Sequence, residues 1–216
     1  MSLSSAHIAA IRTDYQLAAL NETTVGNDPF AFFGKWFLEA QAAEVIEVNA
    51  MTLATVDAQN KPHARIVLLK GLDEKGFVFF TNYDSAKGKE IDANPYAALV
   101  FFWQELERQV RIEGSVVRIS EEESDSYFAS RPEGSKIGAW SSPQSQIIED
   151  RSILEKNYSA FEQKFSGNSI PRPEYWGGYR VIPNKVEFWQ GRSNRMHDRV
   201  VFLRRVNEWS NVRLAP

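Results

Sequence analysis

The hydrophobic period of the chain changes near residue 50, and this change constrains the fold more than any other feature. Short segments rich in β-branched and aromatic residues follow one another, separated by turn signals such as "DAQNKP" and "LDEKG". They read, in chain order, "MTLATV", "HARIVLLK", "GFVFFTN", "YAALVFFW" and "RQVRIEGSVVRIS". Because the connections are short, this order predicts an antiparallel meander or barrel and excludes alternating βαβ units.

Helical patterns flank these strands on the N-terminal side. Residues 4–20 show apolar positions at helical spacing, with Ser4 or Ser5 as the cap. Residues 27–45 predict a second helix, because Asp28 can cap it and Pro29 fits the first helical position. We therefore expect a helical segment over about residues 1–46.

On the C-terminal side, Ser120 and Glu123 form a capping-box pattern that predicts the start of a helix. A further helix is expected within residues 147–165. The chain then returns to strands, at residues 176–183, 185–191 and 198–206, with a turn between the first two at "VIPNKV". The whole, residues 1–216, is expected to be one mainly-β domain with flanking helices.

Composition excludes several classes of protein. The chain has 216 residues, 43% of them hydrophobic, and a formal net charge of −3, which gives no basic field for nucleic acid. It contains no cysteine, so disulfides and thiolate chemistry are excluded. The N-terminus has no signal-peptide pattern, and no apolar run reaches the ~20 residues of a membrane span. We therefore expect a cytoplasmic protein that binds neither membrane nor nucleic acid.

The familiar catalytic motifs are missing as well. No GxGxxG follows a strand, and no serine sits in a GxSxG turn. "AKGKE" fails as the end of a phosphate loop, because Tyr83 stands in place of the first glycine and Glu90 in place of the Ser or Thr. The three histidines lie far apart in the sequence, so we expect no metal site.

Cations and hydroxyls instead gather at strand ends. Arg65 and Lys70 are separated by an odd number of residues, so in a strand they face opposite sides and could serve two anionic groups. Thr81, Ser85 and Lys87 follow a strand at the mouth of a short helix, an arrangement that suits a phosphate. Solvated strand-end charges and an ordinary capped helix are the alternatives.

Tyr127, Arg131 and Ser135 recur at spacings of four and would share a helix face, although Pro132 predicts that the helix ends nearby. Such donors suit a phosphate monoester, and the alternative is an arginine that stabilises a helix end.

The segment "RMHDR" places Arg195, His197 and Arg199 at spacing two. If it is extended, they form one polar ladder, which needs an anion or an electron-rich ring above it. The alternative is a solvated edge strand that positive charges protect from aggregation.

These segments together resemble the pyridoxamine 5'-phosphate oxidase family, in order and spacing, over nearly the whole chain. The resemblance is carried by "RIVLLK", "FFTNYDSAKGKE", "ERQVRIEG", "YFASRPEGSKIGAW", "PQSQ", "VEFWQGRSNRMHDR" and "RLAP". It implies an FMN-binding split β-barrel of antiparallel Greek-key type and a homodimer with FMN at the subunit interface. It also implies oxidation of pyridoxamine or pyridoxine 5'-phosphate to pyridoxal 5'-phosphate, with O2 as acceptor and H2O2 as product.

The resemblance also assigns residues by position. For the cofactor it implies Arg65, Ile66, Val67, Leu68, Lys70, Thr81, Ser85, Lys87, Gln109, Gln144, Ser145, Trp189 and Arg199. For the substrate it implies Arg12, Tyr15, Lys70, Tyr127, Arg131, Ser135, Arg195 and His197, of which Arg195 and His197 would be catalytic. Residues 12–15, "RTDY", match a segment that can close over the substrate, although they depart from the family's more basic "RREY".

Two other positions depart from the family pattern. Ala86 stands where the family usually has an arginine, which removes one expected phosphate contact, and Phe80 replaces a common tyrosine. Two other classes of function remain open: a protein of the same fold that carries FMN or pyridoxal phosphate without turnover, and a flavin reductase that uses a nicotinamide. A nucleic-acid module is a more distant alternative, since the chain has no basic surface.

Overall fold

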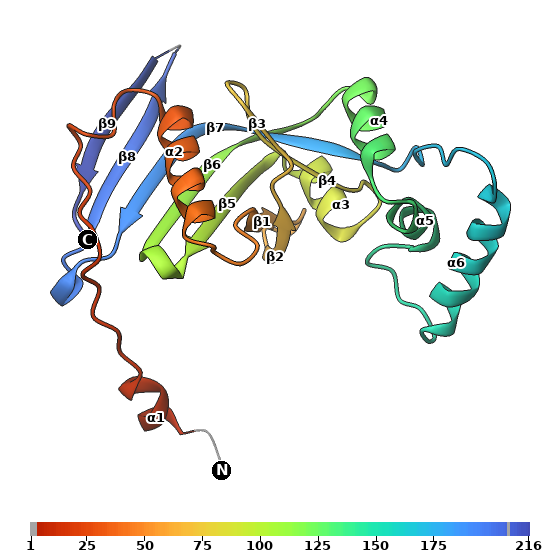
Figure 1. Ribbon diagram of the computed structural model, residues 1–216, viewed down its shortest axis with the longest axis horizontal. Helices are drawn as coiled ribbons and strands as arrows, with labels where there is room; N and C mark the ends of the chain where they lie inside the picture. The colour runs from red at the N-terminus through yellow and green to blue at the C-terminus, as the bar shows by residue number, and fades with distance from the viewer. Residues whose placement is uncertain (1–3, 207) are drawn as a thin grey trace. The chain divides into compact units, whose positions relative to one another are not determined.

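The computed structural model describes residues 4–206 and 208–216 and shows a mainly antiparallel sheet with flanking helices (Figure 1). The α-helices are α1 (Ser5–Ala10), α2 (Pro29–Ala42), α3 (Ala86–Ala93), α4 (Glu121–Ser130), α5 (Glu133–Ser141) and α6 (Ser152–Phe165). The strands are β1 (Ala50–Val56), β2 (Pro62–Leu68), β3 (Gly71–Asp73), β4 (Gly76–Asn82), β5 (Tyr96–Trp103), β6 (Arg108–Arg118), β7 (Trp176–Gln190), β8 (Asp198–Arg205) and β9 (Glu208–Leu214). Short 3-10 turns cover Gln104–Leu106 and Ser193–Arg195.

The strands pair in the order β2-β1-β5-β6-β7-β4-β3, and β8 pairs with both β7 and β9. The β1–β2 hairpin is antiparallel, with Ala50 opposite Leu68 and Val56 opposite Pro62. Strand β7 pairs with β4 through its first residues and with β8 through its last. The five central strands predicted from the sequence are confirmed as β1, β2, β4, β5 and β6, and the sequence patterns missed β3 and β9.

The cap signals predicted three helix starts correctly, those of α1, α2 and α4. Ser4 accepts a hydrogen bond from the His7 amide, and Asp28 accepts one from Phe30 ahead of α2. Ser85 caps α3, and Ser120 forms a complete capping box with Glu123 at the start of α4. Helix α4 ends at Ser130, as the following Arg131-Pro132 pair predicted.

The predicted helix over residues 4–20 is wrong beyond Ala10, since α1 has only six residues. The backbone amides of Leu17 and Leu20 do not bond within a helix. They donate instead to the side chains of Glu107 and Asp198. Tertiary contacts therefore override a weak local preference for helix.

The predicted turn at "VIPNKV" is also wrong, because β7 runs without interruption from Trp176 to Gln190. The pairing with β4 ends at Val181 and the pairing with β8 begins at Lys185. Pro183 lies in the interval between these two ladders, where no amide is needed for either. A proline at a change of partner strand therefore looks like a turn in the sequence.

Contacts between residues divide the chain into two compact units. The first comprises Met1–Val48, Val100–Ile112 and Lys185–Pro216, and the second comprises Asn49–Leu99 and Glu113–Asn184. Within the first unit, the ring of Phe32 lies 4.7 Å from that of Phe188, and Phe33 lies 5.1 Å from Phe101. Within the second, Phe79 packs 5.7 Å from Tyr179. The expectation of a single domain over residues 1–216 stays a prediction.

Within the described residues, no helix is long and apolar enough to cross a membrane. The same residues contain no group of three or more histidine, cysteine, aspartate or glutamate side chains able to hold a metal ion.

Gly88, in the first turn of α3, lies against the backbone of Tyr83. A Cβ there would lie 2.0 Å from the carbonyl oxygen of Tyr83, so the helix start must shift to admit it. We expect Gly88→Ala to lower the free energy of unfolding by about 1–3 kcal/mol, as overpacking does. Gly34→Ala in α2 is the matched control, since nothing lies within 4 Å of its Cβ. It should raise stability by about 0.5–1 kcal/mol, and equal effects in urea unfolding would contradict the close approach at Gly88.

Candidate functional site

Two cavities collect most of the residues that the sequence singled out, and each is lined by residues of one unit only. The first, here called the cationic cavity, lies in the second unit and has a volume of about 490 Å³. It is lined by Ile66, Val67, Leu68, Lys70, Phe80, Thr81, Asn82, Lys87, Tyr127, Arg131, Ser135, Gly138, Ala139, Ser142, Gln144 and Trp176. Three cations and several hydroxyl and amide groups therefore face one space, and no carboxylate is among the described residues that line it.

One wall of the cationic cavity is an aromatic stack. The Phe80 ring lies 3.8 Å from that of Tyr127 and 5.4 Å from that of Trp176, all nearly parallel. The Arg131 guanidinium lies 4.6 Å from the Trp176 ring, which adds a cation–π contact. Phe80, at the position where the sequence departs from the usual tyrosine, thus stacks directly on the ring of Tyr127.

Arg131 is short of hydrogen-bond partners. Its Nη1 is buried, and it has no hydrogen-bond partner anywhere in residues 4–206 and 208–216. Burial lowers the pKa of Arg131, while Tyr127 acts weakly in the opposite direction. A buried donor without a partner is rare and costs free energy, so this guanidinium is set up for an anion.

Lys87, in the first turn of α3, lines the same cavity. Its Nζ donates to Thr81 Oγ1 at 3.3 Å, to Ser85 Oγ at 3.4 Å and to Gln144 Oε1 at 3.4 Å. Burial, and after it the charge of Arg65, lowers the pKa of Lys87. A lysine surrounded by neutral acceptors and near a second cation is stabilised when a phosphate binds.

Arg65 does not line the cationic cavity. Its Nη2 lies 2.7 Å from Glu90 Oε2, and its Nη1 donates to Thr55 Oγ1. Burial acts against ionisation of Glu90, but the bonds from Thr55 and Arg65 outweigh it and lower the pKa of Glu90. Lys70 follows β2 and lines the cavity, so the two cations have different surroundings.

The second cavity, here called the Tyr15–His197 cavity, lies in the first unit and has a volume of about 560 Å³. Its walls are two stretches of chain, residues 11–15 and 192–197. They contribute Ile11, Arg12, Thr13, Asp14, Tyr15, Arg192, Asn194, Arg195 and His197. The predicted substrate residues Arg12, Tyr15, Arg195 and His197 therefore share one cavity.

An aromatic cluster joins the two walls. The His197 ring lies 4.6 Å from that of Trp189 and 6.0 Å from that of Tyr15. A Cβ on Gly191 would lie only 2.7 Å from Cβ and Cγ of Tyr15, so only glycine lets the N-terminal segment approach this closely.

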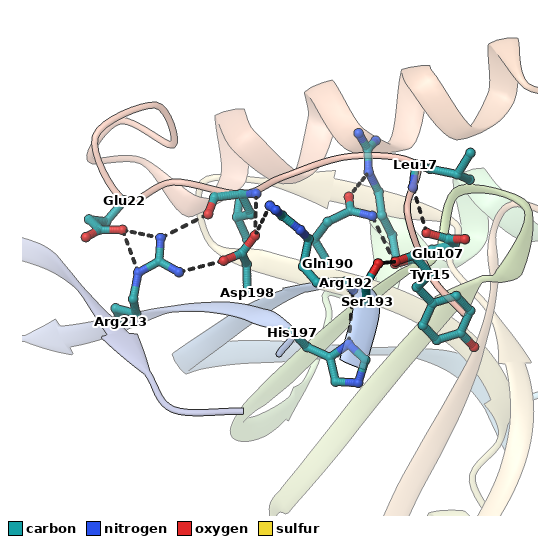
Figure 2. Close-up of polar contacts among 12 residues, drawn as sticks. Tyr15, Leu17, Glu22, Glu107, Gln190, Arg192, Ser193, His197, Asp198 and Arg213 are labelled. Carbon is teal, nitrogen blue, oxygen red and sulfur yellow. Dashed lines mark hydrogen bonds and ion pairs between the residues drawn. The ribbon is translucent and has the colours of Figure 1, made fainter. Parts of the chain in front are cut away.

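His197 has one nitrogen engaged. Its Nδ1 accepts a hydrogen bond from the Arg192 amide at 3.1 Å (Figure 2). In the neutral ring, this bond places the proton on Nε2, which remains able to donate. The preceding residues Asn194 and Arg195 have φ of 57° and 61°, a left-handed turn that is uncommon for residues with side chains.

The predicted ladder of Arg195, His197 and Arg199 is wrong. Residues Ser193–Arg195 form a 3-10 turn, and β8 begins only at Asp198, so the spacing of two does not set a common face. Arg199 instead pairs with the buried Glu187, with Nε–Oε1 at 2.8 Å and Nη2–Oε2 at 3.1 Å. This bidentate ion pair gives Arg199 the anionic partner that the predicted ladder required from a bound ligand.

Several other predicted cofactor residues do not line either cavity. Ser85 is buried as the cap of α3, Gln109 is half-buried in β6, and Ser145 is exposed with φ of 70°. Sequence reasoning missed Trp176 and Arg192. The "WGG" of "EYWGG" and the first arginine of "GRSNR" were the available signals, and neither reveals its contacts without the fold.

Comparison with known proteins identifies the family. Residues 37–165 match the family described as "Pyridoxamine 5'-phosphate oxidase", and residues 176–216 match "Pyridoxine 5'-phosphate oxidase C-terminal dimerisation region". The chain is 56% identical over 212 residues to a pyridoxine/pyridoxamine 5'-phosphate oxidase of Burkholderia multivorans, covering 97% of this chain and 99% of that protein. It is 53% identical to the protein of the same name from Pseudomonas fluorescens, covering 97% and 98%.

Solved structures agree with the predicted fold. PhzG from Burkholderia lata, in complex with tetrahydrophenazine-1-carboxylic acid, matches with a TM-score of 0.88 at 27% identity, covering 94% of this chain and 100% of that one. A pyridoxamine 5'-phosphate oxidase-related, FMN binding protein from Nostoc punctiforme matches in fold, with a TM-score of 0.69 at 19% identity, covering 88% and 98%. The split β-barrel class expected from the sequence is thereby confirmed. With this fold, both matched regions and relatives above half identity, the chain is an oxidoreductase that belongs to the pyridoxine/pyridoxamine 5'-phosphate oxidase family.

Proposed function

We propose that this chain is an FMN-dependent oxidase that converts pyridoxamine or pyridoxine 5'-phosphate to pyridoxal 5'-phosphate. Dioxygen would be the acceptor and H2O2 the product; with the amine substrate, water would enter and ammonia would leave. FMN, when bound, supplies the electron acceptor and the reaction with dioxygen. The protein would act in the cytoplasm, as a homodimer with FMN at the subunit interface.

The observation that carries this proposal is the buried Nη1 of Arg131, which has no hydrogen-bond partner among the described residues and lies in a cavity with Tyr127, Ser135 and Lys70. A phosphate monoester brings acceptor oxygens for Arg131 Nη1 and for the donors beside it, and an arginine fork suits its geometry. We assign the substrate phosphate to this group. A substrate without a phosphate would leave the Arg131 guanidinium buried and without an anionic partner, so this set of donors favours phosphorylated vitamers.

The residues present also fit FMN. Lys87, Thr81 and Gln144 form a second set of phosphate partners, and Ile66, Val67 and Leu68 line the same cavity. We assign the FMN phosphate to Lys87 and its neighbours. Arg65, which Glu90 holds in place outside the cavity lining, would add its positive charge to the field at the FMN phosphate.

Arg195 and His197 would bind and orient the substrate ring. Both line the Tyr15–His197 cavity, where His197 Nε2–H is available as a donor. Arg12 and Tyr15 would form the other wall around the substrate. Arg199 would contribute its positive charge to the flavin site, and its ion pair with Glu187 would hold the guanidinium in place.

The experiment uses purified protein loaded with FMN. Pyridoxamine 5'-phosphate added in air should yield equal amounts of pyridoxal 5'-phosphate and H2O2. A protein that holds FMN but yields neither would be a carrier, and bleaching of the flavin band by NADH alone would indicate a reductase. Unphosphorylated pyridoxamine is the matched control and should react far more slowly.

Ala86 gives a prediction for FMN affinity. It is an exposed residue in the first turn of α3, directly before Lys87. An arginine there should add one charge-assisted bond to the FMN phosphate, worth about 1.5–3 kcal/mol, or roughly ten- to a hundredfold in Kd. We expect Ala86→Arg to tighten FMN binding by that factor in titrations of apoprotein, and Ala86→Gln to change it little. Equal Kd values for wild type and Ala86→Arg would mean that Arg65 or another cation already fills the role.

A further inference from the structure

Asp198 follows His197 in the chain and bonds both to Arg192 and to Leu20, in the two stretches of chain whose neighbouring residues line the Tyr15–His197 cavity. Figure 2 shows its carboxylate between two arginines, Arg213 on one side and Arg192 on the other. Oδ1 accepts from Arg213 Nη1 at 2.7 Å, and Oδ2 accepts from Arg192 Nη1 at 3.1 Å. Oδ2 also accepts from the backbone amide of Leu20 at 3.0 Å. One side chain thus touches both the N-terminal segment and the loop that carries His197.

The contact with Arg192 reaches His197 through one residue. Arg192 is held at its guanidinium by Asp198, and its backbone amide donates to His197 Nδ1. This amide defines which ring nitrogen carries the proton and which way the ring points. If Arg192 moves, His197 loses the bond that directs Nε2.

The contact with Leu20 reaches Tyr15 along the chain. Arg213 reinforces it, since Nη2 donates to the Leu20 carbonyl at 3.0 Å while Glu22 holds the same guanidinium at 2.6 Å. The segment is fixed at two further points, where Leu17 N–H donates to Glu107 and Ser193 Oγ donates to the Tyr15 carbonyl. Helix α1 ends at Ala10, so residues 11–20 have no helical backbone hydrogen bonds to order them. The hydrogen bonds to side chains take their place.

The charge balance agrees with this role. Burial raises the pKa of Asp198, but the amide of Leu20 and the cations Arg213 and Arg192 outweigh it, so the net pKa is lowered. The carboxylate therefore stays ionised and retains all three partners.

We propose that Asp198 is a positioning residue that couples the seating of residues 11–20 to the orientation of His197. The inference rests on the proposed function, in which this cavity takes the substrate ring. Asp198 touches neither substrate nor cofactor in this account. Its effect is to hold the Tyr15 and His197 rings at their observed spacing of 6.0 Å, so that both walls of the cavity contact the substrate at the same time.

Asp198→Asn is the direct test, on the FMN-loaded protein. Whichever way the amide turns, its NH2 group faces the donors of an arginine, so at least one of the ionic contacts is lost. We expect hydrogen exchange in the peptide covering residues 11–20 to rise at least tenfold in rate. KM for pyridoxamine 5'-phosphate should rise about tenfold, as expected for one charged hydrogen bond, with kcat changed less than about threefold. The His197 side-chain ¹⁵N signals should shift toward a mixture of tautomers.

Asp125→Asn is the matched control, because it also breaks an aspartate–arginine pair, with Arg172 at 2.6 Å. It should leave KM, the exchange of residues 11–20 and the His197 signals unchanged. Gly191→Ala is the second variant, since its Cβ displaces Tyr15 without altering Asp198. It should raise exchange and KM while the His197 tautomer is retained.

Unchanged exchange in Asp198→Asn overturns the proposal, and so does a higher KM without a change in exchange or in the His197 signals. The exchange and ¹⁵N measurements need no turnover. If the wild-type chain fails to oxidise pyridoxamine 5'-phosphate, the proposed function fails, and these two measurements still decide whether Asp198 couples the two walls.

Discussion

Arg131→Leu should raise KM for pyridoxamine 5'-phosphate by roughly a hundredfold, corresponding to about 3 kcal/mol for loss of one partner of a buried charge pair. FMN content should stay near that of wild type, because Lys87, Thr81 and Gln144 keep their contacts with one another. Folding should survive the change, since leucine replaces a buried guanidinium whose Nη1 has no hydrogen-bond partner among the described residues. Steady-state kinetics and the flavin absorbance of the purified variant measure the two effects separately.

Arg131→Lys provides the control for charge alone. Lysine keeps the positive charge but cannot present the planar fork or stack on Trp176 in the same way. We expect its KM to fall between those of wild type and Arg131→Leu. Loss of flavin as the main effect of Arg131→Leu would show that the two phosphates have been assigned to the wrong groups of residues.

Arg195→Leu should lower kcat/KM by roughly a hundred- to a thousandfold, as expected when a positioning contact to the substrate ring is lost. His197→Asn should act differently. An asparagine oxygen can accept from the Arg192 amide in place of Nδ1, so the loop is retained while the side chain can no longer act as a general acid or base. We expect kcat to stay within about tenfold of wild type, whereas loss of a general acid or base would lower it by about 10²–10⁴.

His197→Gln separates the two nitrogens of the ring. Its amide reaches farther than that of asparagine and can replace the Nε2 donor, but not the bond to Arg192. If only the donor matters, glutamine should rescue KM better than asparagine. Abolished turnover in His197→Asn with substrate binding intact would replace the positioning role with proton transfer.

Much of the fold could be predicted because its signals are local. Asp28 and Ser120 begin helices through caps that involve only neighbouring residues. Strand segments such as "GFVFFTN" are apolar over enough consecutive residues to be recognised without knowledge of their partners. Where the prediction was wrong, long-range contacts decide. Leu17 and Leu20 give their amides to Glu107 and Asp198, far along the chain, and no local pattern contains that information.

The candidate site divides in the same way. Tyr127, Arg131 and Ser135 were found from their spacing, and they meet in one cavity even though a helix break separates Arg131 from Ser135. The spacing of Arg195, His197 and Arg199 predicted a strand face that does not form. A left-handed turn at Asn194 and Arg195 precedes β8, which begins only at Asp198. Glu187 is buried in β7 and takes Arg199, a pairing that depends on the β7–β8 register.

Anaerobic stopped-flow mixing tests the central claim most directly, because it follows the bound flavin and the substrate in one reaction. FMN-loaded protein mixed with pyridoxamine 5'-phosphate in the absence of dioxygen should lose its oxidised flavin band in a single turnover and form one equivalent of pyridoxal 5'-phosphate. Admission of air should restore the band and release one equivalent of H2O2. A flavin band that pyridoxamine and pyridoxine 5'-phosphates leave unchanged, in protein that holds FMN, would contradict the account.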